Sequence, residues 1–105
     1  MDNTDPSTNT VFSQIPDSDE RDVQIAVDAA KQAFVGWSTM PVKKRSDLLL
    51  RIAALIEKNL QRFAEAESLD NGKPVWLAKQ VDIPRASANF HFYATAALHL
   101  AAETH

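Results

Sequence analysis

The chain has 105 residues, 45% of them hydrophobic, a formal net charge of −3 and no cysteine. This length suits one small domain or a piece of a larger one. The interspersed acidic and basic residues exclude the one-sided basic surface of a nucleic-acid-binding protein, and the missing cysteine excludes disulfides, thiolate zinc sites and thiol nucleophiles.

No segment approaches the run of about 20 apolar residues that a membrane span requires. The polar start, MDNTDPSTNT, has neither the basic nor the apolar region of a secretory signal. We therefore expect a cytoplasmic protein without a membrane partner.

The first predicted element is a short β-strand after a turn. Residues Asp5 to Thr10 are turn formers, and TVFSQIP then alternates its side chains between two faces until Pro16 closes it. A lone strand cannot pair its own backbone groups. We therefore expect its partner to lie outside this chain or in a second copy.

An amphipathic helix is predicted next, capped by Ser18 or Asp19 and ending near Gly36. Its apolar stripe has helical spacing: Val23, Val27, Ala30, Phe34 and Trp37. A second stripe follows, begun by Ser38 or Thr39 with Pro41 in the first turn. Its members are Leu48, Ile52, Leu55, Ile56, Leu60, Phe63 and Ala66.

The second stripe is too long for one ordinary helix, so we predict a break at Asn59 and an end at Asn71–Gly72. Both glycines are read as left-handed helix C-caps. Further on, Pro84 is expected to stop the helix and force a restart with Asp82 as the N-cap. The restarted helix carries Phe90, Ala94, Ala97 and Ala101 on one face.

Most catalytic constellations are missing from the sequence, which has no glycine-rich phosphate loop. His91 and His99 are eight residues apart, a spacing that favours ordinary histidines over metal ligands. Ser87 has no identifiable acid and base partners. The aromatic side chains suit a core or interface better than a ligand box. Asp82 keeps two interpretations: a structural capping acid, or a ligand of a hard cation.

Several stretches together resemble the amino-terminal part of the NAD(P)-dependent aldehyde dehydrogenase superfamily: DVQIAVDAAKQAF with the following Trp37, the helix from Arg45 to Asn59, and ESLDNGKP. DIPRASANFHFYATAALH is most similar to the branch that handles 2-aminomuconate and hydroxymuconate semialdehydes. The family turn N-P-x-T-G-E appears here with Asn9 in the glycine position, which asparagine tolerates because it can adopt positive φ.

This resemblance implies a mostly α fragment of an α/β fold, with one N-terminal β-strand and three to five helices. Residues 1–105 would form the helical part of an incomplete nucleotide-binding domain. In similar proteins a structural monovalent cation is held by the aspartate matching Asp82 and by main-chain carbonyls matching Asn3 and Thr4. The family's catalytic cysteine and glutamate, its oxyanion-hole asparagine and its nucleotide-binding motif match nothing here.

The parent protein is therefore expected to use NAD or NADP, whereas this chain alone should bind neither and be catalytically inert. Its partner would be the remainder of the dehydrogenase chain or another copy, so we expect self-association and a homo-oligomer. Two alternatives are a small helical interaction module and an independent enzyme that uses Asp, Glu or His chemistry.

Overall fold

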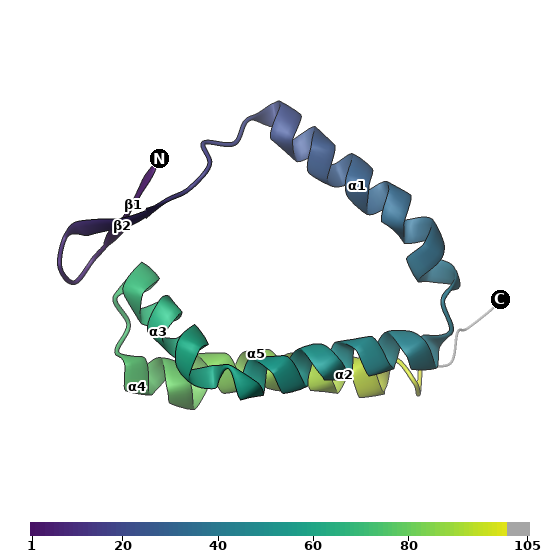
Figure 1. Ribbon diagram of the computed structural model, residues 1–105. Helices are drawn as coiled ribbons and strands as arrows, with labels where there is room; N and C mark the ends of the chain where they lie inside the picture. Colours follow the sequence, from purple (N-terminus) through teal and green to yellow (C-terminus); the bar gives the residue numbers. More distant parts are fainter. Residues whose placement is uncertain (101–105) are drawn as a thin grey trace.

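The computed structural model describes residues 1–100 of the chain. Its elements follow in the order β1 (Asp2–Asp5), β2 (Thr10–Gln14), α1 (Glu20–Thr39), α2 (Val42–Lys58), α3 (Leu60–Asn71), α4 (Val75–Leu77), the π-helical turn η1 (Ala78–Asp82) and α5 (Ile83–Ala96). The predicted class, mostly helical with a small amount of β-structure at the N-terminus, is confirmed (Figure 1).

The two strands form an antiparallel hairpin, so the prediction of one strand with a partner elsewhere is wrong. β1 is the polar run DNTD, which has no apolar alternation to indicate a strand. The turn creates the pairing: Asn9 adopts φ 57°, as expected for it, and its N–H donates to Asp5 O at 2.8 Å. The register shifts between Asn3 and Thr4.

Helix α1 begins as predicted at Asp19, whose carboxylate accepts from the N–H groups of Arg21 and Asp22. It ends at Thr39 rather than near Gly36, so Gly36 is not a C-cap. The Thr39 hydroxyl donates to Val35 O within the last turn of α1. Ser38 and Thr39 therefore close this helix and do not begin the next one.

Helix α2 begins after Pro41, and the predicted break at Asn59 separates it from α3. The Asn59 side chain donates to Leu55 O at 2.8 Å, so it closes α2 and makes no side-chain cap for α3. Helix α3 ends as predicted at Gly72, which has the left-handed φ of 78° that glycine permits.

The predicted stop and restart at Pro84 is wrong. Helix α4, η1 and α5 follow one another without a break, and Pro84 lies in the first turn of α5. The N–H of Ile83 donates to Ala78 O, five residues back, so the wider π turn absorbs the register change just before the proline. Residue Ala101 of the predicted apolar face lies outside the described residues.

The main packing is between α2 and α5, which run side by side in Figure 1. Small side chains bring these helices close together: Ser46 and Ala53 on α2, with Ser87 and Ala94 on α5, are buried. Helix α1 has no buried residue and stands apart from this pair. No helix among the described residues is long and apolar enough to cross a membrane.

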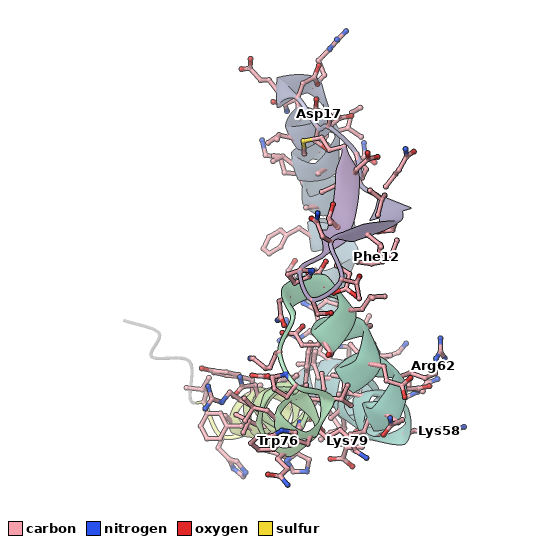
Figure 2. All side chains as sticks on the ribbon, turned by 90° about the vertical axis from the view of Figure 1, so that its left-hand side faces the viewer. Phe12, Asp17, Lys58, Arg62, Trp76 and Lys79 are labelled. Atoms are coloured by element: carbon pink, nitrogen blue, oxygen red, sulfur yellow. The ribbon has the colours of Figure 1, made fainter. Side chains whose placement is uncertain are left out.

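The molecule is open rather than compact. Its radius of gyration is 18.0 Å, against about 13 Å for a compact domain of 100 residues. Figure 2 shows the hairpin and α1 above the layer that α2 and α5 form, with Trp76 and Lys79 at the bottom of the view. A single well-covered core is therefore missing from the described part of the chain.

Candidate functional site

Asp82 lies in the π turn η1 and caps no helix N-terminus, since its backbone is helical and no side-chain cap bond is made at the start of α5. Its carboxylate instead accepts a hydrogen bond from Lys73 Nζ at 2.6 Å. Both side chains are about one-third exposed or less. The capping interpretation of Asp82 is therefore wrong, and the carboxylate is part of a semi-buried ion pair.

Lys73 is positioned by the end of α3. Gly72 N–H donates to Ser68 O at 2.8 Å in the left-handed cap, and Lys73 N–H donates to Asn71 Oδ1 at 2.8 Å. These two bonds fix the backbone from which the Lys73 side chain reaches across to η1. The ion pair thus ties the turn after α3 to the π turn.

Asn3 and Thr4 lie in β1, on either side of the register shift. The Asn3 side-chain amide donates to Asp70 Oδ1 at 2.8 Å, which fastens the hairpin to α3. Strand β1 and η1 both pack against α3. Among the described residues, however, no hydrogen bond joins Asn3 or Thr4 to Asp82.

The hairpin also touches the end of α3 at Gly72. A β-carbon added there would lie 2.9 Å from Pro6 Cγ, closer than non-bonded carbons approach one another. The hairpin, the end of α3 and η1 thus meet at three contacts: Asn3–Asp70, Pro6–Gly72 and Lys73–Asp82. We call this region the hairpin–α3 junction.

Asp5 is a buried carboxylate within this hairpin. Its Oδ1 accepts from the hydroxyl and the backbone N–H of Ser7, at 2.6 and 2.8 Å. These bonds hold the pKa of Asp5 below its usual value, because they stabilise the ionised form. The sequence contained the signal in Asp-Pro-Ser, an arrangement typical of an Asx turn, but burial of the carboxylate depends on the unexpected strand β1.

The other candidates carry no catalytic arrangement. The Ser87 hydroxyl is buried between α2 and α5, where it donates to Glu57 Oε1 at 2.8 Å and lies 3.2 Å from Ala53 O. His91 borders an open groove of about 470 Å³, whereas His99 lies beyond the end of α5. No group of three or more His, Cys, Asp or Glu side chains suited to a metal occurs in residues 1–100.

Comparison with known proteins gives one consistent answer. The model of the aldehyde dehydrogenase family matches residues 1–105. The chain belongs to the aldehyde dehydrogenase family. Its resemblance to this family is therefore confirmed.

Two similar relatives are the 2-aminomuconic semialdehyde dehydrogenases of Bos taurus and Homo sapiens, which are 45% and 43% identical over 98% of this chain. The solved structure of PnpE in complex with nicotinamide adenine dinucleotide is also similar, with a TM-score of 0.92 and 33% identity over 95% of this chain. The chain spans about a fifth of the length of each of these proteins.

The similarity to a solved aldehyde dehydrogenase structure explains the open shape. The described residues match a small part of a much larger structure at a TM-score of 0.92, so their arrangement belongs to that fold even where little packing holds it. With no cysteine in the chain, no thiol can act as a nucleophile here.

Proposed function

We propose that the chain is the amino-terminal segment of an NAD(P)-dependent aldehyde dehydrogenase that oxidises a muconic semialdehyde to the carboxylic acid. The observation that carries this proposal is the match of 45% identity over 98% of the chain to a 2-aminomuconic semialdehyde dehydrogenase. The PnpE complex supports a nicotinamide dinucleotide as the cofactor of the complete protein.

Within that protein, the segment would act as a scaffold. Helix α1 buries none of its residues, and Val23 and Phe34, which share its apolar stripe, are 60% and 64% exposed. Such a surface is stabilised by covering it, either with the remainder of the dehydrogenase chain or with another copy. We expect the complete protein to be a homo-oligomer in the cytoplasm, and this chain alone to be inert and to bind no nucleic acid.

The experiment compares the chain alone with the same chain joined to the remainder of a dehydrogenase. Both are given a muconic semialdehyde and NAD or NADP, and formation of the reduced cofactor is followed. Turnover only by the joined protein supports the proposal. Turnover by the chain alone, above that of a mock purification, would show that it carries its own catalytic groups.

A small helical interaction module is the second candidate, favoured by the uncovered face of α1. Purification from cells that contain the dehydrogenase remainder separates the two functions. A stoichiometric complex with an unrelated protein supports the module, whereas a complex with the dehydrogenase remainder supports the scaffold.

We also propose a monovalent-cation site formed by the Asp82 carboxylate and the main-chain carbonyls of Asn3 and Thr4. Two observations support a fit: the carboxylate is semi-buried, and the register shift at Asn3 and Thr4 interrupts the ladder where carbonyls can turn outward. Lys73 already supplies one positive charge to Asp82, so a bound cation would share or replace that contact.

Thermal unfolding in sodium, potassium and choline chlorides at equal ionic strength tests this site. Selective stabilisation by one small cation, lost in Asp82→Asn, is the expected result. Asp47→Asn is the matched control, because Asp47 pairs with Lys43 at 2.9 Å on the exposed face of α2. Equal stability in all three salts would contradict the site.

A further inference from the structure

Helix α3 ends in the dipeptide Asn71-Gly72. Both the oxygen and the nitrogen of the Asn71 side-chain amide make a hydrogen bond. Asn71 Oδ1 accepts from Lys73 N–H at 2.8 Å, and Asn71 Nδ2 donates to Glu67 Oε1 at 2.6 Å. The next residue, Gly72, has φ 78° and no side chain. Asn71 is exposed, so water and hydroxide can reach the amide.

We propose that Asn71 is a site of spontaneous deamidation through a cyclic imide. Hydroxide removes the proton of Gly72 N, and that nitrogen forms a bond to Asn71 Cγ. The Cγ–Nδ2 bond then breaks, and Nδ2 leaves as ammonia after taking up a proton from water. A second water molecule opens the imide at either carbonyl, which gives aspartate or isoaspartate without any oxidation or reduction.

The hydrogen bonds at Asn71 suit this reaction. The bond from Lys73 N–H polarises the Cγ carbonyl and can hold the negative charge that develops on Oδ1 when the nitrogen attacks. Gly72 leaves the attacking nitrogen uncrowded, since it has no β-carbon. The other asparagines of the chain precede larger residues: Asn3 and Asn9 precede threonine, Asn59 precedes leucine and Asn89 precedes phenylalanine.

The folded C-terminal cap of α3 slows the same reaction. Gly72 N–H donates to Ser68 O at 2.8 Å, and this bond must break before the nitrogen can lose its proton. Asn71 must also rotate out of its helical backbone conformation to close the ring. Because terminal helical turns fray readily, opening of the last turn of α3 would control the rate.

Either product would disturb the hairpin–α3 junction. Both place a new carboxylate beside Glu67 at the negative end of the α3 dipole, where a negative charge is unfavourable. Isoaspartate also inserts one methylene into the main chain before Gly72. That insertion would displace Gly72 from Pro6 and Lys73 from Asp82.

Incubation of the full chain at mildly alkaline pH tests the proposal, with peptide mapping by mass spectrometry and enzymatic labelling of isoaspartate. Conversion at Asn71 should be about tenfold faster than at Asn59 or Asn89, where the larger following residue hinders ring closure. Such a ratio corresponds to the free-energy cost of one unfavourable backbone conformation. In Asn71→Gln, labelling of this peptide should disappear. Equal conversion at all asparagines would overturn the proposal.

A parallel incubation in urea tests whether the folded cap slows deamidation. Conversion at Asn71 should accelerate in urea, because Gly72 N–H is then released from Ser68 O. An unchanged rate would overturn the role assigned to the helix cap. The proposal depends only on the end of α3, so its failure would leave the dehydrogenase assignment untouched.

Discussion

Gly72 and Gly36 differ in what their backbones require. Gly72 has a left-handed φ and lies against Pro6, whereas no atom lies within 4 Å of a β-carbon added at Gly36. Gly72→Ala should lower the free energy of unfolding by about 1–2 kcal/mol from backbone conformation, with the Pro6 clash in addition. Gly36→Ala, the matched control, should raise the helicity of α1. Urea denaturation with circular dichroism measures both changes, and a Gly72→Ala chain of unchanged stability would contradict the cap.

Asp5 predicts a pH dependence of stability. Because the folded chain lowers the pKa of this carboxyl, its contribution is complete above the ordinary value of 3.8 and is lost as the pH falls through the lower folded value. Asp5→Asn should therefore lose less stability than the parent over this acidic window. Urea midpoints at a series of pH values measure the difference.

The control for this pH series is Asp17→Asn, since Asp17 makes no side-chain hydrogen bond among the described residues. The control should keep the full acid loss. If Asp5→Asn and the parent lose stability in parallel, the Ser7 bonds do not hold the Asp5 carboxylate.

Helix α1 is capped at Asp19 and buries none of its own residues. Its stability in this chain must therefore come from local terms such as the capping box of Asp19 and Asp22. Asp19→Ala should remove about 1 kcal/mol of helix stability. Amide exchange should increase in residues 20–39 and stay unchanged in α2 and α5. A global loss of protection would instead show that α1 is packed.

Local chemistry explains which elements the sequence could predict. Asp19, Asn59 and Gly72 carry their signals in their own side chains or in the lack of one, and all three helix boundaries lie where expected. Strand β1 has no such signal, because a polar tetrapeptide becomes a strand only through pairing with β2. A break at Pro84 was likewise predicted because proline disrupts the hydrogen bonds of a regular α-helix. The π turn before Pro84 changes that hydrogen-bond register, so the helix continues.

The candidate site was less predictable than the fold. The sequence singled out Asp82, but its partner Lys73 is nine residues away and reaches it only because the α3 cap and η1 place the two side chains together. The contact between Pro6 and Gly72 likewise joins residues 66 positions apart. Long-range contacts of this kind leave no local pattern in one sequence.

The open shape of the whole molecule and the exposed apolar side chains of α1 predict self-association of the isolated chain. Phe34→Glu should weaken this association, because Phe34 is a large apolar side chain that is 64% exposed on α1. Gln32→Glu is the matched control, since it adds the same single negative charge to α1 at an exposed polar residue without removing apolar surface. Sedimentation velocity over a range of concentrations measures the effect, and a monomer at every concentration would contradict it.

We infer that the chain has a structural role in an aldehyde dehydrogenase whose cofactor pocket and reactive groups lie outside these 105 residues. Calorimetric titration of the isolated chain with NAD and with NADP is the decisive experiment. We expect no saturable heat with either dinucleotide, and saturable heat once the chain is joined to the remainder of the enzyme. Saturable, stoichiometric binding of either dinucleotide to the 105 residues alone would contradict this inference.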